Sequence, residues 1–174
     1  MKMKQLLISS FIICLLVTQA SCQNTFCDDV KYYNINDVEY VIFSKYEYFV
    51  NKSYPEYKYT KFASIDKVLE VDSLAFVFVK RQKNMPNQGF DGCPIIKDSW
   101  EDYCRQVICY LEKKGRRKYD EIIRIQYIHN SEIAHIEDKI DWKKNWVFYR
   151  GGCSLFFNIS YNVSKRKIVD FVVN

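Results

Sequence analysis

The fold of this protein is indicated most clearly by residues 154–163, which read SLFFNISYNV. Apolar side chains recur at every second position: Leu155, Phe157, Ile159, Tyr161 and Val163. Side chains of a strand point alternately to its two faces, so this period of two places the five residues on one buried face. The opposite face, with Phe156, Asn158, Ser160 and Asn162, is expected to be half exposed. After a turn at 164–167, residues 168–173 are predicted to return as the last strand.

More strands are predicted before this hairpin. Residues 38–42 and 123–128 alternate between apolar and polar side chains, and residues 146–149 are predicted as another strand that ends before Gly151. Leu74 to Val79 is a continuous apolar run bounded by charge, which is typical of a buried central strand. Residues 133–140 fit either a second hairpin strand or a short helix.

Two helices are predicted to begin at serines. Ser64 is expected to cap a short helix, because its side-chain oxygen can accept from amides that the first turn leaves unpaired. Ser99 is predicted to begin the main helix, with two carboxylates in its first turn, two lysines near its end and Gly115 after them. The sum is an α+β fold of one domain: an antiparallel sheet with one or two helices packed on one face.

The first residues are typical of a secretory signal. Lys2 and Lys4 precede a run of 12 mostly apolar residues, 6–17, which is shorter than a membrane-spanning helix requires. We therefore divide the chain into a signal peptide at 1–21, a tether or entry segment at 22–35 and a domain at 36–174.

Two cleavage sites are compatible with this signal. Ala20, Ser21 and Cys22 are similar to the bacterial lipobox, in which the cysteine is lipidated and becomes the new N-terminus, although Gln19 stands where an aliphatic residue is usual. Alternatively, Thr18 and Ala20 form an ordinary signal-peptidase site, and the soluble product keeps six cysteines, an even number that suits three disulfides. Lipidation of Cys22 is the preferred interpretation.

The short lysine-rich start and the Ser-Cys-Gln junction resemble those of small, uncharacterised exported lipoproteins of bacterial envelopes. The resemblance covers about the first 25 residues and implies export to the cell envelope, with no implication for activity. The closing hairpin, from Gly151 to Asn174, is similar to that of small exported α+β proteins, which agrees with the predicted fold.

Composition and charge exclude several functions. The 174 residues are 48% hydrophobic and 17% aromatic, which excludes a disordered chain. The formal net charge is +5, and loss of Lys2 and Lys4 with the signal leaves 24 basic and 21 acidic residues, or +3. That balance is too small to indicate nucleic-acid binding.

The Ser-based and nucleotide-binding motifs G-x-S-x-G, G-x-G-x-x-G and the P-loop are missing, and we predict no cofactor.

A tyrosine-rich stretch is the candidate binding surface. Its chosen members are Tyr46, Tyr48, Tyr54, Tyr57 and Tyr59. A row of side chains with apolar rings and polar tips suits a protein or glycan partner, and half-buried strands have the same composition. The loop 80–97, rich in Pro and Gly, is a second candidate for the same surface.

His129 and His135 are the only two histidines, and they carry the alternative function, a small envelope hydrolase that uses one of them with a nearby carboxylate. Glu132 and His135 would share a face of a helix and are weak candidates for a metal site, although a di-metal centre needs a second such pair, which the sequence lacks. A solvated turn is the simpler interpretation.

The cysteines and one basic cluster complete the candidates. On the expected helix, Cys104 and Cys109 are too far around the axis to bridge each other, so their partners would be Cys93 and either Cys27 or Cys153.

The basic residues of 113–118 suit an anionic lipid or polysaccharide surface, or simply a solvated helix end.

The sequence therefore predicts an exported protein, lipid-anchored in a bacterial envelope, that acts by binding a protein or glycan. Its oligomeric state and disulfide connectivity stay open.

Overall fold

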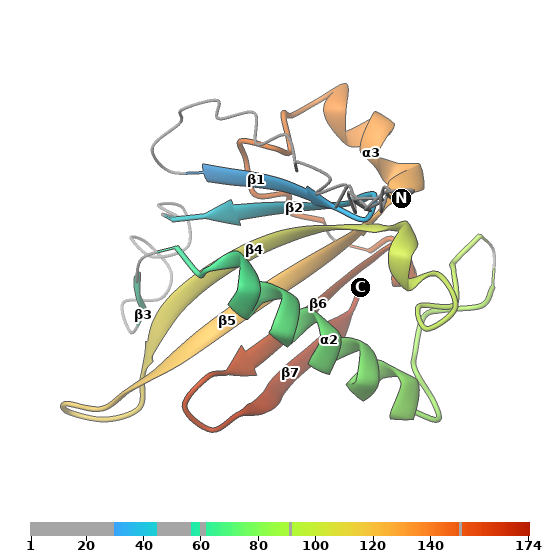
Figure 1. The fold of residues 1–174 in the computed structure, drawn as a ribbon. Coiled ribbons are helices and arrows are strands. Elements are labelled where there is room, and N and C mark those ends of the chain that lie inside the picture. The colour runs from blue at the N-terminus through green and yellow to red at the C-terminus, as the bar shows by residue number, and fades with distance from the viewer. Residues whose placement is uncertain (1–29, 45–56, 60–61, 91, 150) are drawn as a thin grey trace, which may run out of the picture.

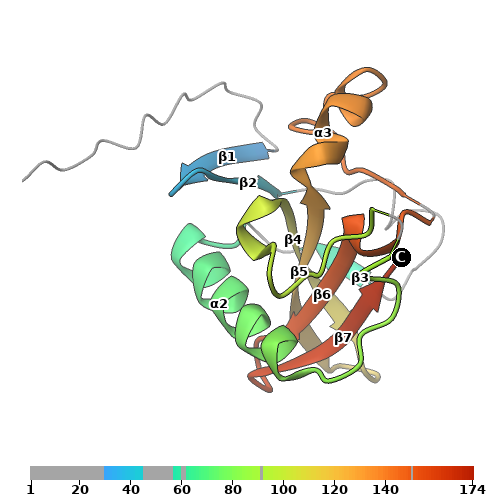
Figure 2. The same ribbon diagram turned by 90° about the vertical axis from the view of Figure 1, so that its right-hand side faces the viewer.

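The computed structural model describes residues 30–44, 57–59, 62–90, 92–149 and 151–174. Seven strands form one sheet in the order β1-β2-β4-β5-β6-β7, with β3 paired to β4. The strands are β1 (Val30–Ile35), β2 (Val38–Phe43), β3 (Tyr57–Tyr59), β4 (Tyr103–Lys113), β5 (Tyr119–His129), β6 (Phe156–Asn162) and β7 (Lys167–Val173). The long helix α2 (Ile65–Arg81) crosses one face of the sheet, and the short helix α3 (Asn130–Glu137) lies near β1 and β2 (Figures 1 and 2).

A single sheet-dominated α+β domain is thus present among these residues, as the sequence predicted. The expectation of an antiparallel sheet is wrong for one pair, because β2 and β4 run parallel, with Val41 opposite Gln106. The connection between them contains β3, α2 and a long loop, and parallel neighbours require a crossover of that kind. The sheet is therefore mixed.

The sheet begins earlier than residue 36. Residues 30–35, which the sequence analysis placed in a tether or entry segment, form β1 and pair with β2 from Val30 opposite Phe43 to Ile35 opposite Val38. Asn36 and Asp37 join the two strands with φ angles of 51° and 64°, and Asn and Asp tolerate this left-handed conformation better than most residues. Residues 22–29 lie outside the described part of the chain.

The main helix predicted from Ser99 is wrong. The 3₁₀ helix η1 (Trp100–Asp102) is a single turn, and the chain then continues as β4, the central strand. Every residue from Tyr103 to Cys109 is buried, since both faces of this strand are covered. The polar alternation that reveals a strand is therefore missing. The charges at the two ends of the segment imitate a capped helix.

The central strand predicted at Leu74 to Val79 is also wrong, because this run is the second half of α2. Ser64 caps this helix as predicted, and its Oγ accepts from the amide of Lys67 at 3.3 Å. A helical period explains the run: Val79 is buried, whereas Leu74 and Val77 are exposed on the outer side.

The larger apolar core joins α2 to one face of the sheet. Its buried members from α2 are Val68, Val71, Ala75 and Val79, and those from the strands include Ile42, Val107, Ile125, Tyr127, Phe157 and Ile159. Trp100 extends this core through ring contacts with Tyr127 at 4.8 Å and Phe157 at 5.8 Å between ring centroids.

A second core covers the opposite face. Trp142, Trp146 and Val147 pack there with Ile136 of α3 and with Phe156 of β6. Ser160 and Asn162 are buried rather than half exposed, and Asn162 Nδ2 donates to Asp120 Oδ2 at 2.9 Å. The strand predicted at 146–149 is not formed. This segment is instead held by buried amides of the sheet: Gln126 Nε2 donates to the carbonyl of Val147 at 2.7 Å, and the amide of Val147 donates to Gln106 Oε1 at 2.9 Å.

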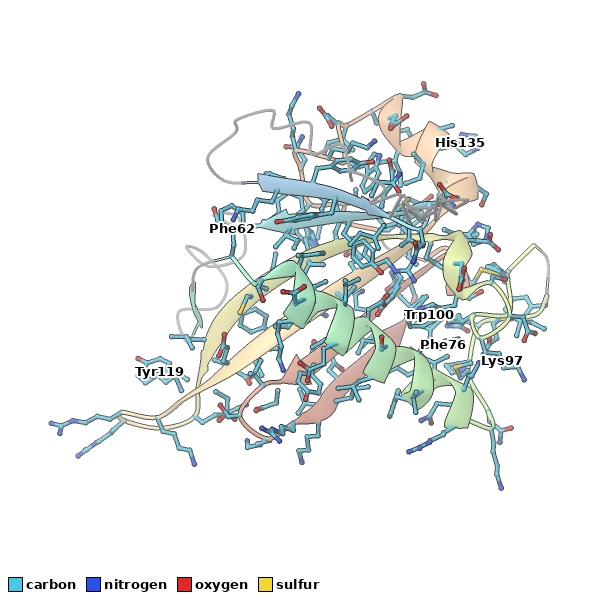
Figure 3. All side chains as sticks on the ribbon, in the orientation of Figure 1. Phe62, Phe76, Lys97, Trp100, Tyr119 and His135 are labelled. Atoms are coloured by element: carbon cyan, nitrogen blue, oxygen red, sulfur yellow. A yellow bond between two sulfur atoms is a disulfide. The ribbon has the colours of Figure 1, made fainter. Side chains whose placement is uncertain are left out.

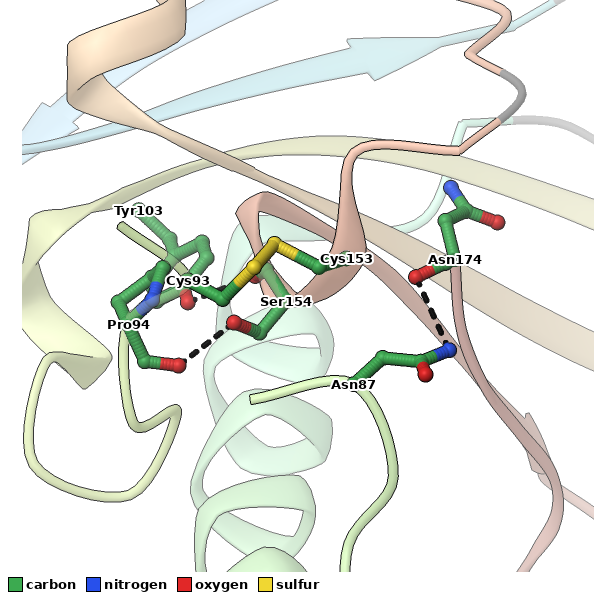
Figure 4. Close-up of a disulfide and its surroundings, with 7 residues drawn as sticks. All are labelled: Asn87, Cys93, Pro94, Tyr103, Cys153, Ser154 and Asn174. Atoms are coloured by element: carbon green, nitrogen blue, oxygen red, sulfur yellow. Dashed lines mark hydrogen bonds between the residues drawn. A yellow bond between two sulfur atoms is a disulfide. The ribbon is translucent and has the colours of Figure 1, made fainter. Parts of the chain in front are cut away.

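A disulfide between Cys93 and Cys153 fastens the loop after α2 to the start of β6 (Figure 4). Ser154 adds two hydrogen bonds, from its amide to the carbonyl of Asn87 at 2.9 Å and from its Oγ to that of Pro94 at 2.6 Å. The predicted pairing of Cys104 and Cys109 with other cysteines is wrong for Cys93, whose partner is Cys153. On a strand, residues 104 and 109 point to opposite faces.

No helix in the described ranges has the length and apolar character needed to span a bilayer.

Candidate functional site

A pocket of about 480 Å³ lies where the N-terminal end of α2 meets the sheet. Its lining residues are Lys31, Tyr33, Phe62, Ala63, Ser64, Ile65, Lys67, Glu121, Ile123 and Val163. They come from β1, from the chain that leads into α2, from β5 and from the residue after β6. Phe62 lies just before the first turn of α2 (Figure 3). The volume is within the range of roughly 300–1,000 Å³ that is usual for small-ligand sites.

The polar groups of this pocket carry both signs of charge. The ammonium group of Lys31 lies 4.6 Å from the centre of the Phe62 ring, and that of Lys67 bonds Glu70 on the same helix at 2.8 Å. Glu121 is positioned from within the sheet, because the Cys109 thiol on the neighbouring strand donates to its Oε1 at 3.5 Å. The pocket therefore offers aromatic and aliphatic walls with two cations and one carboxylate, a combination that suits a ligand with both apolar faces and hydrogen-bonding groups.

The tyrosine-rich stretch leads directly into this pocket along the chain. Tyr46, Tyr48 and Tyr54 lie outside the described residues. Tyr57 and Tyr59 are the two ends of β3, which pairs with β4 so that Tyr57 is opposite Glu112 and Tyr59 is opposite Tyr110. Phe62 follows β3 by three residues, so the candidate surface and the pocket are neighbours in sequence.

Sequence reasoning missed a charged cluster inside the larger core. Asp72 of α2 accepts from the hydroxyl of Tyr40 and from that of Tyr127, both at 2.8 Å, and its Oδ2 lies 3.5 Å from Nε of Arg105. Burial, and then the Asp72 carboxylate, raise the pKa of both tyrosines well above the usual value. These groups do not line the pocket, and Tyr40, Tyr127 and Arg105 each contact Asp72, so we interpret them as a structural link between helix and sheet.

A second polar cluster lies around Glu39. Tyr32 donates to its Oε1, Lys143 donates to the same oxygen at 2.9 Å, and the Cys104 thiol lies 3.7 Å from Oε2. Burial acts to raise the pKa of Glu39, but the hydrogen bonds from Tyr32 and Lys143 outweigh it and lower the pKa. Burial, followed by the Glu39 charge, raises the pKa of Cys104 to about 12, so this thiol is protonated and a poor nucleophile at neutral pH.

The two histidines lie at the two ends of α3. His129 caps α3: its Nδ1 accepts from the amide of Ser131 at 3.3 Å, and its ring meets the edge of Tyr103 at 5.0 Å between centroids. His135 is exposed in the last turn of the same helix. Neither residue lines the pocket, and no ion pair joins either one to a carboxylate among the described residues.

Glu132 and His135 share α3, which is helical as one of the two sequence interpretations required. No group of three or more potential ligands to a metal is found in the part of the chain that the structure describes. The lipidation candidate Cys22 lies outside that part.

The basic residues of 113–118 lie at the tip of the β4–β5 hairpin rather than at a helix end. The hairpin projects from the body of the protein, and long nitrogen-tipped side chains extend beyond Tyr119 (Figure 3).

Comparison of the chain with protein-family models, with curated proteins and with solved structures gives no match.

Proposed function

We propose that this is an exported protein, lipid-anchored at Cys22 to a membrane of the cell envelope, which acts by binding a glycan or a protein. The observation that carries the binding role is the pocket at the start of α2, where Tyr33 and Phe62 stand beside Lys31, Lys67 and Glu121. The tyrosine stretch from Tyr46 to Tyr59, which precedes Phe62 in the chain, is proposed to take part in the same binding.

Export is supported by the Cys93–Cys153 disulfide as well as by the signal-like start. Disulfides persist in oxidising compartments and are rare in the cytosol. The intact mass of the protein isolated from membranes tests the anchor, since a diacyl or triacyl addition on Cys22 is expected. A product that begins at Ser21 in the soluble fraction would instead establish the alternative of a secreted soluble protein.

Of the two ligand classes, the pocket favours a glycan. Sugar rings present apolar faces that stack on aromatic side chains, and their hydroxyls bond carboxylates and ammonium groups, all of which are present here. A stable protein–protein interface would need a larger surface, since such interfaces bury roughly 1,200–2,000 Å² in total.

Saturation-transfer NMR with oligosaccharides released from the envelope of the producing cell tests this assignment. We expect a signal from the wild type that is lost in Lys31→Gln, whose exposed side chain contributes little to folding, and in Phe62→Ala. Phe148→Ala, which removes a 53% exposed ring outside both the pocket and the loop 80–97, is the matched control and should leave the signal unchanged. Equal signals from all four proteins would refute the pocket as the binding site.

A further inference from the structure

Two basic turns lie at the same end of the sheet. The β4–β5 turn contains Lys113, Lys114, Arg116, Arg117 and Lys118, and the β6–β7 turn contains Lys165, Arg166 and Lys167. The strands before and after these turns are neighbours, with Ile122 of β5 opposite Asn162 of β6. Lys165 joins them directly, because its Nζ lies 2.6 Å from Oδ2 of Asp120. We call residues 112–121 and 164–167 together the basic end.

The basic end accounts for the whole net charge of the chain. It holds eight Lys and Arg against three carboxylates, Glu112, Asp120 and Glu121. After loss of Lys2 and Lys4 with the signal the chain has 24 basic and 21 acidic residues, so 16 basic and 18 acidic residues remain elsewhere and the positive charge is concentrated here. Such asymmetry creates a local positive field that a count for the whole chain conceals.

Most of these cations have no carboxylate partner in the described residues. Lys165 pairs with Asp120, and Lys114 pairs with Glu112 at 2.7 Å. The other six are exposed and form no ion pair within 4 Å among the described residues, although, after the hydrogen bond from Lys165, the charge of Lys118 also helps to lower the pKa of Asp120. They are Lys113, Arg116, Arg117, Lys118, Arg166 and Lys167. Their charges are thus available to a polyanionic partner outside the protein.

The strand directions place the start of the domain toward this same end. Val30, the first residue of β1, pairs with Phe43, which in turn is opposite Ile108 of β4. Ile108 precedes Lys113 by five residues, about 17 Å along the strand. Cys22 precedes Val30 by eight residues, which span at most roughly 29 Å of extended chain. A lipid on Cys22 therefore keeps the basic end within reach of the membrane surface.

We propose that the basic end docks on the anionic phospholipid headgroups of the membrane that holds the lipid anchor. The anchor and the cations lie toward the same end of the domain, which favours a bilayer as the partner. Binding to an anionic polysaccharide would not require the cations to lie near the anchor. Each basic residue near an anionic bilayer raises affinity about fivefold, so six cations suffice to orient an anchored domain. The inference rests on the proposed anchor at Cys22, which intact mass tests separately.

Tryptic cleavage of the anchored protein, reconstituted in vesicles, tests this orientation. Vesicles of phosphatidylcholine alone are compared with vesicles that also contain phosphatidylglycerol. We expect cleavage after Arg116 and Arg117 to be at least tenfold slower on the anionic vesicles, and the protection to vanish at 1 M salt, where the screening length is about 3 Å. Cleavage after Lys144, an exposed lysine in another turn, is the internal control and should proceed equally on both.

Two variants test whether the protection depends on the cations of the basic end. In Arg116→Gln/Arg117→Gln/Lys118→Gln, the remaining sites at Lys113 and Lys114 should be cut equally on both kinds of vesicle. Lys80→Gln/Arg81→Gln/Lys83→Gln removes three cations at and just beyond the C-terminal end of α2, away from the basic end, and should retain protection. Equal cleavage of the wild type on both vesicles, or protection on both, overturns the proposal. Protection by a soluble anionic polysaccharide but not by anionic vesicles would replace the membrane with a polysaccharide as the partner.

Discussion

The carboxylate of Asp72 and the guanidinium of Arg105 face each other inside the core, with Oδ2 3.5 Å from Nε. Asp72 belongs to α2 and Arg105 to β4, so the pair joins the helix to the centre of the sheet. The terminal nitrogens of Arg105 donate to the carbonyls of Tyr103 and Trp100. Each charge therefore has several partners, and loss of one partner leaves the other charge buried without compensation.

We expect Asp72→Asn to lower the free energy of unfolding by about 3–5 kcal/mol, the usual cost of an uncompensated buried charge. Urea denaturation measures this change. Glu70→Gln is the matched control on the same helix: its side chain is 55% exposed and pairs with Lys67, so the loss should be below about 1 kcal/mol. Similar losses for the two variants would contradict a paired buried charge at Asp72.

The Cys93–Cys153 disulfide closes a loop of 60 residues that contains η1, β4, β5 and α3. By the chain-entropy relation, cross-linking a loop of this length stabilises the fold by about 4 kcal/mol. We therefore expect the Cys93→Ser/Cys153→Ser variant to unfold at a lower urea concentration than the oxidised protein. Reduced wild type should match the variant, and a reductant should not change the variant's midpoint.

The raised pKa of Cys104 predicts that its thiol reacts slowly with alkylating reagents. Its folded pKa of about 12 lies above the ordinary thiol value of 9.0, so the thiolate fraction at pH 8 is lower by roughly a thousandfold. Peptide-resolved labelling with iodoacetamide should find Cys104 unmodified in the folded protein and modified in urea. Because the pKa is raised on folding, the stability linked to this group is complete below pH 9 and is lost as the pH rises toward 12.

The elements that the sequence predicted correctly are those specified by nearby residues. Ser64 caps α2 through a contact three residues away, and Phe157, Ile159 and Tyr161 alternate along β6. The segment around Val107 was misassigned as a helix, because its strand is covered on both faces and the covering residues, such as Trp142, come from distant parts of the chain. Local charge patterns could not reveal that coverage.

The candidate pocket could not be predicted for the same reason. Lys31, Phe62, Glu121 and Val163 are brought together only by the order of the strands and by the path into α2. The aromatic stretch before residue 60 was the one local signal, and it ends next to Phe62. The basic residues of 113–118 were found from the sequence, but their place at a hairpin tip required the strand assignment of β4 and β5.

The Gly151–Gly152 pair offers a matched test of how the loop before β6 is packed. Both residues have left-handed backbones, with φ of 84° and 88°, so a side chain at either costs about 1–2 kcal/mol. A Cβ on Gly151 would meet nothing within 4 Å. A Cβ on Gly152 would lie 3.0 Å from both the Tyr149 and the Phe156 rings, which stack with centroids 3.9 Å apart.

We therefore expect Gly152→Ala to destabilise the protein more than Gly151→Ala, by about 1–3 kcal/mol of overpacking, when both are measured by urea denaturation. A double-mutant cycle identifies the cause. Tyr149 is 44% exposed, so Tyr149→Ala alone should cost little, and combined with Gly152→Ala it should recover part of the loss by removing one of the two rings in the way. Additive effects in the cycle would show that the Tyr149 ring does not contribute to the loss at residue 152, which would then come from the Phe156 ring and the backbone conformation.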